Sequence, residues 1–193
     1  MRLCHALSFG IAFATAVSNS SAYADPVAGG QRTASCAHCH GTDGNSSSGA
    51  YPTLAGQNKE YLYRQIKAFK EGSRKNSQMS PMVGILSDQE MQDIADFYNT
   101  QSPRPSTFKG DPAVIEQGKK LTAEAQCASC HLPNFKGSNE IPRLTRQKQP
   151  YLVKQLKDYR DGARTNDGGI MSTVVKSLTD EQIEAIAQYL ATL

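Results

Sequence analysis

The sequence predicts an all-α protein made of two similar helical domains in tandem, joined by a proline-rich linker. Three observations predict this fold class. The same motifs recur in the same order in both halves of the 193-residue chain, apolar residues recur at helical spacing, and β-branched runs typical of a large sheet are absent. A chain of this length suffices for one ordinary domain or two small ones with modest cores.

The internal repeat extends over most of the chain. Residues 61–67 match residues 151–157, and Leu86-Ser87-Asp88 matches Leu178-Thr179-Asp180, with spacing kept within one or two residues. We interpret this as duplication of a domain rather than as a solenoid.

Residues 103–112 lie between the two copies and hold three prolines and one glycine. This composition is typical of an extended linker. The first domain is therefore predicted over residues 25–102 and the second over residues 113–193.

Each copy is predicted to contain three helices. The first leads into a cysteine motif and is clearest over 112–126, where Pro112 suits a first-turn position. The second covers 59–71 in one copy and 149–161 in the other. The third opens with a capping box, Ser87-x-x-Glu90 or Thr179-x-x-Gln182. We expect the third helix to pack against the first, since neither is apolar all round.

Residues 1–24 differ in character from the rest. Arg2 precedes a short apolar segment at 7–17, and Ala22-Tyr23-Ala24 has the small-x-small pattern that signal peptidase cleaves. The apolar segment is too short for a stable membrane anchor, so we expect cleavage before Asp25, export to the periplasm and no stable membrane insertion.

The charge balance argues against nucleic-acid binding. Lysine and arginine number 21 against 18 acidic residues, and loss of the leader lowers the net charge from +3 to +2. The charge is spread along the chain without a basic run.

The cysteines after the leader form two pairs, each followed directly by a histidine: Cys36-Ala37-His38-Cys39-His40 and Cys127-Ala128-Ser129-Cys130-His131. Cys-x-x-Cys-His is the attachment sequence of c-type haem. The two thiols add to the two vinyl groups of the porphyrin, and the histidine becomes the proximal iron ligand. We therefore predict two covalently bound haem c groups, attached through Cys36, Cys39, Cys127 and Cys130, with His40 and His131 on the irons.

Three other uses of the cysteines are weighed against haem. Two structural disulfides are usual for an exported chain with four cysteines. A thioredoxin-like dithiol needs a βαβ context, which is absent, and a zinc site would join both pairs in one tetrahedral cluster. None of these explains the histidine that follows each pair.

The repeat selects the sixth iron ligand. Met171 is the single methionine of the second copy and lies seven residues before Leu178, as Met79 lies seven before Leu86. We predict Met79 and Met171 as axial ligands, and interpret Met82 as an apolar wall and Met91 as core. The alternative is that every methionine merely fills gaps. Thioether ligation favours ferrous iron and suits an electron carrier rather than an enzyme.

Two further pairs have alternative interpretations. Pro52 and Pro142 follow the motifs at nearly equal distance, and each either offers its carbonyl to the proximal histidine or is an ordinary turn proline. Arg74 and Arg164 either pair with haem propionates or are solvated.

With these motifs in place, the chain resembles the cytochrome c4 family. The resemblance rests on both Cys-x-x-Cys-His motifs, on His40-Gly41-Thr42-Asp43-Gly44-Asn45-Ser46, on Leu54-Ala55-Gly56-Gln57, and on Met79 upstream of Leu86-Ser87-Asp88. It implies two class I cytochrome c domains facing one another, with histidine and methionine on both irons. It also implies electron transfer from a cytochrome bc complex toward a haem–copper terminal oxidase.

Two other functions are compatible with parts of the pattern. A dihaem cytochrome subunit of a dehydrogenase complex, as in a flavocytochrome, uses the same fold and ligands. A two-haem peroxidase needs an open iron, which methionine at both haems argues against.

Overall fold

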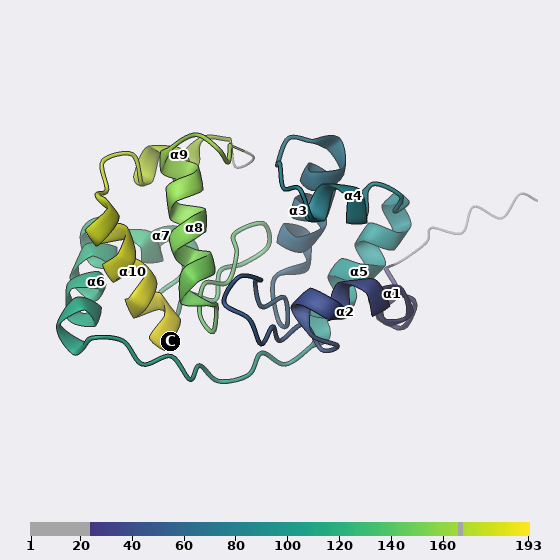
Figure 1. Ribbon diagram of the computed structural model, residues 1–193, viewed down its shortest axis with the longest axis horizontal. Coiled ribbons are helices and arrows are strands. Elements are labelled where there is room, and N and C mark those ends of the chain that lie inside the picture. The colour runs from purple at the N-terminus through teal and green to yellow at the C-terminus, as the bar shows by residue number, and fades with distance from the viewer. Residues whose placement is uncertain (1–23, 166–167) are drawn as a thin grey trace, which may run out of the picture.

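The computed structural model describes residues 24–165 and 168–193, and shows two helical bundles side by side (Figure 1). Apart from Ala24, the predicted leader lies outside these residues. The bundles are formed by α1 (Pro26–Arg32), α2 (Ala34–His40), α3 (Lys59–Glu71), α4 (Met79–Val83) and α5 (Asp88–Thr100), and by α6 (Pro112–Glu124), α7 (Cys127–His131), α8 (Gln149–Arg160), α9 (Ile170–Val174) and α10 (Asp180–Thr192). Within the described ranges, β pairing is limited to one isolated bridge between Ser138 and Ile141. The all-α prediction is confirmed.

The predicted helices agree with the structure except at the end of the first one. Helix α3 has the predicted bounds, and α8 is one residue shorter than expected. The prediction over 112–126 was wrong at its end, because α6 stops at Glu124. Gln126 then takes a left-handed φ of 52°, which turns the chain before the cysteine motif begins its own short helix, α7.

Both third helices begin with the predicted capping box. The Ser87 hydroxyl accepts a hydrogen bond from the Glu90 backbone N–H, and the Glu90 carboxylate accepts one from the Ser87 N–H. Thr179 and Gln182 make the same reciprocal pair at α10. Each box satisfies donors that a helix start leaves without partners.

The first and third helices of each copy pack against each other, as expected, and they cross at a glycine. A Cβ on Gly29 would lie 2.1 Å from the Asp93 carbonyl oxygen of α5, and one on Gly118 would lie 2.0 Å from the Ala185 carbonyl oxygen of α10. No side chain fits at such distances, so glycine permits the backbone contact that brings the helices together.

Small apolar clusters fill the bundles behind the cysteine helices. Leu62, Ile94, Ala95 and Tyr98 form the first cluster, with Cys36 packed against it. The second contains Phe135, Leu152, Ile186, Ala187, Leu190 and Ala191, with Cys127 against it. In both copies, the first cysteine of the motif therefore faces the interior.

Two matched pairs of hydrogen bonds, each made by a glutamine side chain to the backbone of one residue, join the bundles; we call them the amide brackets. The Gln57 side chain donates to the Arg143 carbonyl at 2.9 Å and accepts from the Arg143 N–H at 2.7 Å. The Gln147 side chain makes the same pair of bonds to Thr53, at 3.0 and 2.8 Å. All four residues are buried, and each glutamine binds backbone of the opposite copy. This arrangement fixes how the two copies face each other.

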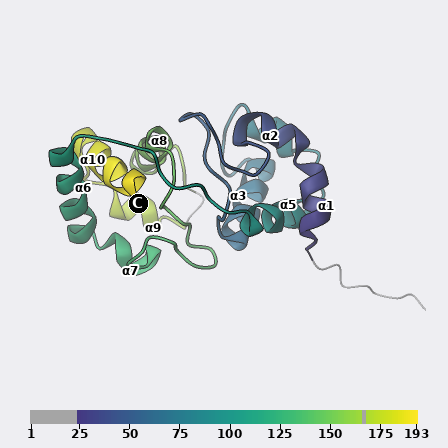
Figure 2. The same ribbon diagram turned by 90° about the horizontal axis from the view of Figure 1, so that it is seen from below.

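The linker runs along both bundles in an extended path (Figure 2). The Asn45 side chain bonds the Ser102 carbonyl and the Arg104 N–H in the first bundle. The Ser106 hydroxyl donates to the Ala191 carbonyl of α10. Over residues 24–165 and 168–193, no helix has both the length and the apolar character needed to cross a bilayer.

The glycine crossing gives a stability prediction. Gly118→Ala should lower the free energy of unfolding by about 1–3 kcal/mol, because α6 and α10 must separate to admit the methyl group. This loss outweighs the gain of about 1 kcal/mol in helix propensity. Chemical denaturation of the holoprotein measures the difference.

Lys119→Ala is the matched control, since it changes the next, exposed residue of α6. A Gly118→Ala protein as stable as wild type would show that the two helices do not need this close approach.

Candidate functional site

Each cysteine pair lies on a short helix with its two thiols one turn apart. Cys36 and Cys39 are on α2, and Cys127 and Cys130 are on α7. All four are free thiols, and burial raises the pKa of Cys36 and of Cys127. The pairs belong to separate bundles, and no group of three or more His, Cys, Asp or Glu side chains suited to a metal ion occurs among the described residues. The joint zinc cluster and the disulfides therefore have no support in this arrangement.

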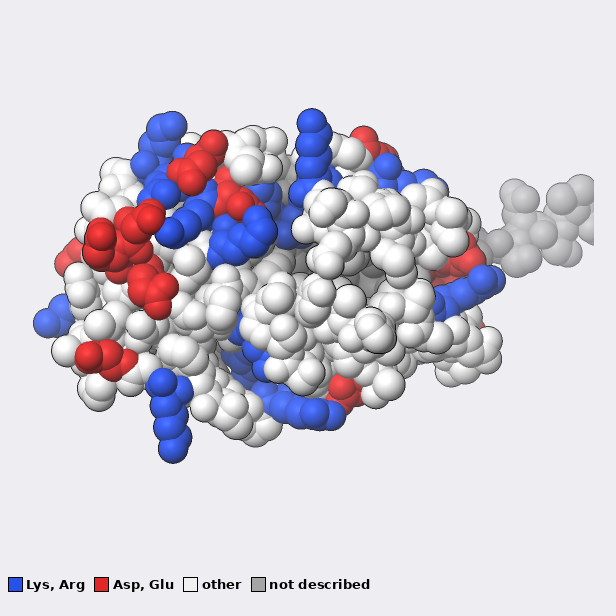
Figure 3. Space-filling view, viewed as in Figure 1, with Lys and Arg blue, Asp and Glu red and all other residues white. Residues whose placement is uncertain are grey.

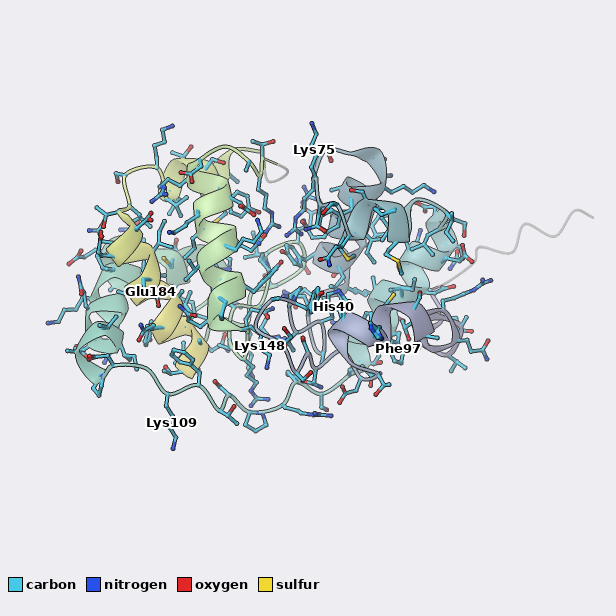
Figure 4. The ribbon with its side chains drawn as sticks, in the orientation of Figure 1. His40, Lys75, Phe97, Lys109, Lys148 and Glu184 are labelled. Atoms are coloured by element: carbon cyan, nitrogen blue, oxygen red, sulfur yellow. The ribbon has the colours of Figure 1, made fainter. Side chains whose placement is uncertain are left out.

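The histidine that ends each cysteine helix is buried and held by one ring nitrogen. His40, labelled in Figure 4, is 5% exposed, and its Nδ1 lies 3.0 Å from the Pro52 carbonyl oxygen. His131 is 6% exposed, with Nδ1 2.9 Å from the Pro142 carbonyl oxygen. Of the two interpretations offered for these prolines, the one in which the carbonyl bonds the histidine is confirmed. A carbonyl only accepts, so Nδ1 carries the proton and Nε2 keeps its lone pair for a ligand.

Burial also keeps both imidazoles in the ligand form. It lowers the pKa of His40 and of His131 below the ordinary histidine value, against a smaller opposing effect of the proline carbonyls. A neutral imidazole is the form that binds a metal.

The predicted methionines lie on short helices that the sequence did not predict. Met79 begins α4, where the Asn76 side chain accepts a hydrogen bond from the Met79 N–H at 2.9 Å. Met171 lies on α9 and, like Met79, is half-buried. Met91 is buried in the core as expected, and Met82 is 44% exposed, so its interpretation as an apolar wall stays a prediction.

Arg74 and Arg164 form a matched network between α3 and α8. Both are buried, so the solvated alternative was wrong. Arg74 donates to Gln65 of its own copy and to Tyr151 and Gln155 of the other. Arg164 donates to Gln155 of its own copy and to Tyr61 and Gln65 of the other. The positive charges thus meet at the junction of the two copies.

Arg143 is a buried interface residue that the sequence did not single out. It takes the position of Thr53 in the first copy. Its guanidinium donates across the interface to the Gly56 carbonyl at 3.1 Å and to the Ala55 carbonyl at 2.6 Å, and to Thr145 of its own copy. Burial and the nearby Arg146 lower its pKa to about 10, so Arg143 is charged at neutral pH.

The first bundle also holds a buried hydroxyl with no hydrogen-bond partner in the described part of the chain. Tyr98 is 1% exposed and its Oη has no bond, while burial raises its pKa. It packs in the cluster that Cys36 contacts, and the second copy has Leu190 there. The surroundings of the two cysteine helices therefore differ in polarity.

These residues fit a covalently held porphyrin in each bundle. Paired thiols reach one edge of a ring, a neutral imidazole follows directly, and a thioether lies on another short helix of the same bundle. Buried arginines suit propionates. A helical bundle with these features defines a c-type cytochrome domain, and this chain has two.

Comparison with known proteins agrees. The family model described as cytochrome c matches residues 27–102 and 115–193. Cytochrome c4 of Stutzerimonas stutzeri is 39% identical over 186 residues, covering 86% of this chain and 88% of that protein. The thiosulfate dehydrogenase electron acceptor of Thiomonas intermedia is 36% identical over 170 residues, covering 82% and 78%. The crystal structure of reduced recombinant cytochrome c4 from Pseudomonas stutzeri superposes with a TM-score of 0.84 at 38% identity, covering 89% of this chain and all of that one.

The chain belongs to the cytochrome c4 family. It is an electron carrier with two covalently bound haem c groups, and the resemblance inferred from its motifs is confirmed.

The buried arginine gives a prediction for the interface. Arg143→Thr, which installs the residue of the other copy, should weaken docking of the bundles by about 2–4 kcal/mol, because it removes charge-assisted bonds and leaves buried carbonyls without donors. Faster proteolysis of residues 103–112 and a larger radius in small-angle scattering measure the loosening.

Lys176→Ala serves as control, since it removes a positive charge from an exposed residue of the second copy. Equal proteolysis rates in Arg143→Thr and wild type would mean that the other contacts between the copies hold the bundles together without this arginine.

Proposed function

We propose that this protein is exported to the periplasm and carries electrons from a cytochrome bc complex toward a terminal oxidase. One observation supports the proposal: each bundle has a paired-cysteine helix that ends in a buried histidine and, on another short helix, a half-buried methionine. Closing both faces of each iron leaves no position for substrate and suits electron transfer.

Specific residues are assigned to each haem under this proposal. Cys36 and Cys39 attach the first haem, and His40 and Met79 are its axial ligands. For the second haem, the corresponding residues are Cys127, Cys130, His131 and Met171. The bound group supplies a one-electron couple, and thioether ligation raises its potential.

The protein's own contribution is to hold these ligands without rearrangement. The Pro52 and Pro142 carbonyls fix the imidazole rings, and burial keeps the rings neutral. Asn76 orders the start of the helix that begins with Met79. Second-sphere bonds of this kind determine ligand orientation and basicity.

The surfaces of the two bundles differ in charge, although both expose apolar side chains beside the methionine. Near Met79, Met82 is 44% exposed and Ile85 is 89% exposed. On the helix of Met171, Ile170 is 62% exposed and Val174 is 41% exposed. On the face in Figure 3, the first bundle is largely uncharged, whereas charged side chains gather over the second. A carrier that receives electrons from one protein and delivers them to another can use one end for each.

Ligand assignment is tested by Met171→Ala. We expect loss of about half of the near-infrared charge-transfer absorbance of methionine–iron ligation, because one of the two thioethers is removed. Absorption spectroscopy of the oxidised holoprotein, with haem counted per chain, makes the measurement.

Met82→Ala is the control, since Met82 lies at the surface and should leave the band at full intensity. An undiminished band in Met171→Ala would contradict the assignment.

A second candidate function has support from one relative. The thiosulfate dehydrogenase electron acceptor of Thiomonas intermedia aligns with most of this chain, which suggests a carrier or subunit working with a dehydrogenase. The exposed apolar loop at Ile85 is compatible with such an interface.

The two functions predict different behaviour in native extract. A free carrier should elute alone in size exclusion, be reduced by quinol through a purified cytochrome bc complex, and be reoxidised by oxidase-containing membranes. Co-elution with a dehydrogenase, together with reduction by that enzyme and not by the bc complex, would replace the first proposal with the second.

A further inference from the structure

A carboxylate is buried where the exported chain is proposed to begin. Asp93 of α5 is 7% exposed. It accepts hydrogen bonds at 2.8 Å from the Gln89 side chain and at 2.8 Å from the backbone nitrogen of Asp25. None of the ion pairs formed within residues 24–165 and 168–193 includes Asp93. A buried ionised carboxylate is costly unless a cation pairs with it.

Cleavage before Asp25 changes the chemistry of this contact. Water adds across the Ala24–Asp25 peptide bond: its hydroxyl goes to the Ala24 carbonyl carbon and its hydrogen to the Asp25 nitrogen. The new amine takes up a proton near neutral pH, because the pKa of an α-amino group is about 8. The atom that lies 2.8 Å from Asp93 thereby becomes a cation.

The second copy of the domain serves as an internal control. Asp25 and Asp111 play the same part, each capping the first helix of its bundle with its side chain. The Asp111 backbone nitrogen remains an ordinary amide after processing, and it bonds the neutral Gln188 side chain of α10 at 3.2 Å. The residue that matches Asp93 is Ala185, because Gly29 packs against the Asp93 carbonyl in the first copy and Gly118 packs against the Ala185 carbonyl in the second. At these matched positions, the acid therefore occurs in the copy whose first residue becomes a chain start, and alanine occurs in the other.

The helix start adds a second reason for a counter-charge. The N-terminus of a helix carries a partial positive charge, so an ammonium group there is unfavourable unless an anion is close. The Asp25 carboxylate is already engaged with the Val27 N–H at 2.8 Å. Asp93 supplies a further negative charge from the helix that crosses α1.

We infer that removal of the leader between Ala24 and Asp25 creates an α-ammonium group that pairs with buried Asp93 and locks α1 onto α5. The inference rests on the proposed export of the chain. Helix α1 continues through Thr33 into α2, which carries Cys36, Cys39 and His40. Processing thus completes the support of the first cysteine helix.

The test compares three variants of the exported holoprotein with wild type. Asp93→Asn removes the anion, a Ser-Gly insertion before Asp25 moves the ammonium group away, and the third variant combines both. Intact mass establishes where each chain begins. Amide hydrogen exchange of residues 25–33, followed by mass spectrometry, measures how often α1 opens.

We expect each single change to raise exchange of α1 about tenfold or more, and the combined change to add little, because both remove one interaction. Glu71→Gln, which alters an exposed carboxylate at the end of α3, should have no effect. If Asp93→Asn raised the exchange of α1 by the same factor in the inserted chain as in the wild-type chain, the pairing would be overturned. Wild-type chains beginning at Tyr23 would also overturn it and would leave export intact, whereas chains beginning at Met1 would contradict export itself.

Chemical labelling keeps the inference testable if Asp93→Asn fails to fold. Pairing raises the pKa of the amine, and the reactive form is the unprotonated amine. At a pH below the pKa, each unit by which the pKa rises lowers the unprotonated fraction about tenfold. In wild type, an amine-specific acylating reagent should therefore label Asp25 more slowly than it labels the amine of the inserted variant. Equal labelling rates would contradict the ion pair.

Discussion

The hydrogen bond between each proximal histidine and a proline carbonyl is the constraint on which the other features of the site depend. It fixes a buried, neutral ring with one nitrogen free, and a haem iron bound to that nitrogen would have its position set by the ring. The cysteine helix would then hold the same haem through its thiols. Under the proposed ligation, the methionine helix would supply the second iron ligand. A bundle of this size has little freedom left once these directions are fixed.

The elements that could be predicted from sequence are those with local signals. Helix α3 and both capping boxes follow from residues three or four apart, and the ligand motifs are contiguous or repeated. Helices α4 and α9 have five residues each, too few to show a period. The end of α6 depends on the left-handed Gln126, which no common turn residue marks.

The residues of the interface could not be found in this way. Arg143 bonds carbonyls 87 and 88 residues earlier in the chain, and Gln57 bonds backbone 86 residues later. Sequence reasoning identified Arg74 and Arg164 as a matched pair but did not place them between the copies. Their position depends on how two bundles dock, which the pattern of either bundle alone does not contain.

The amide brackets have a consequence for how the duplicated halves diverged. Gln57 and Gln147 recognise main-chain atoms, which every residue type offers, so these hydrogen bonds are compatible with threonine at position 53 and with arginine at position 143. The brackets can therefore persist while the electrostatic surroundings of the two copies differ. Two copies that began as equals could in this way acquire separate redox identities without passing through a form whose halves came apart.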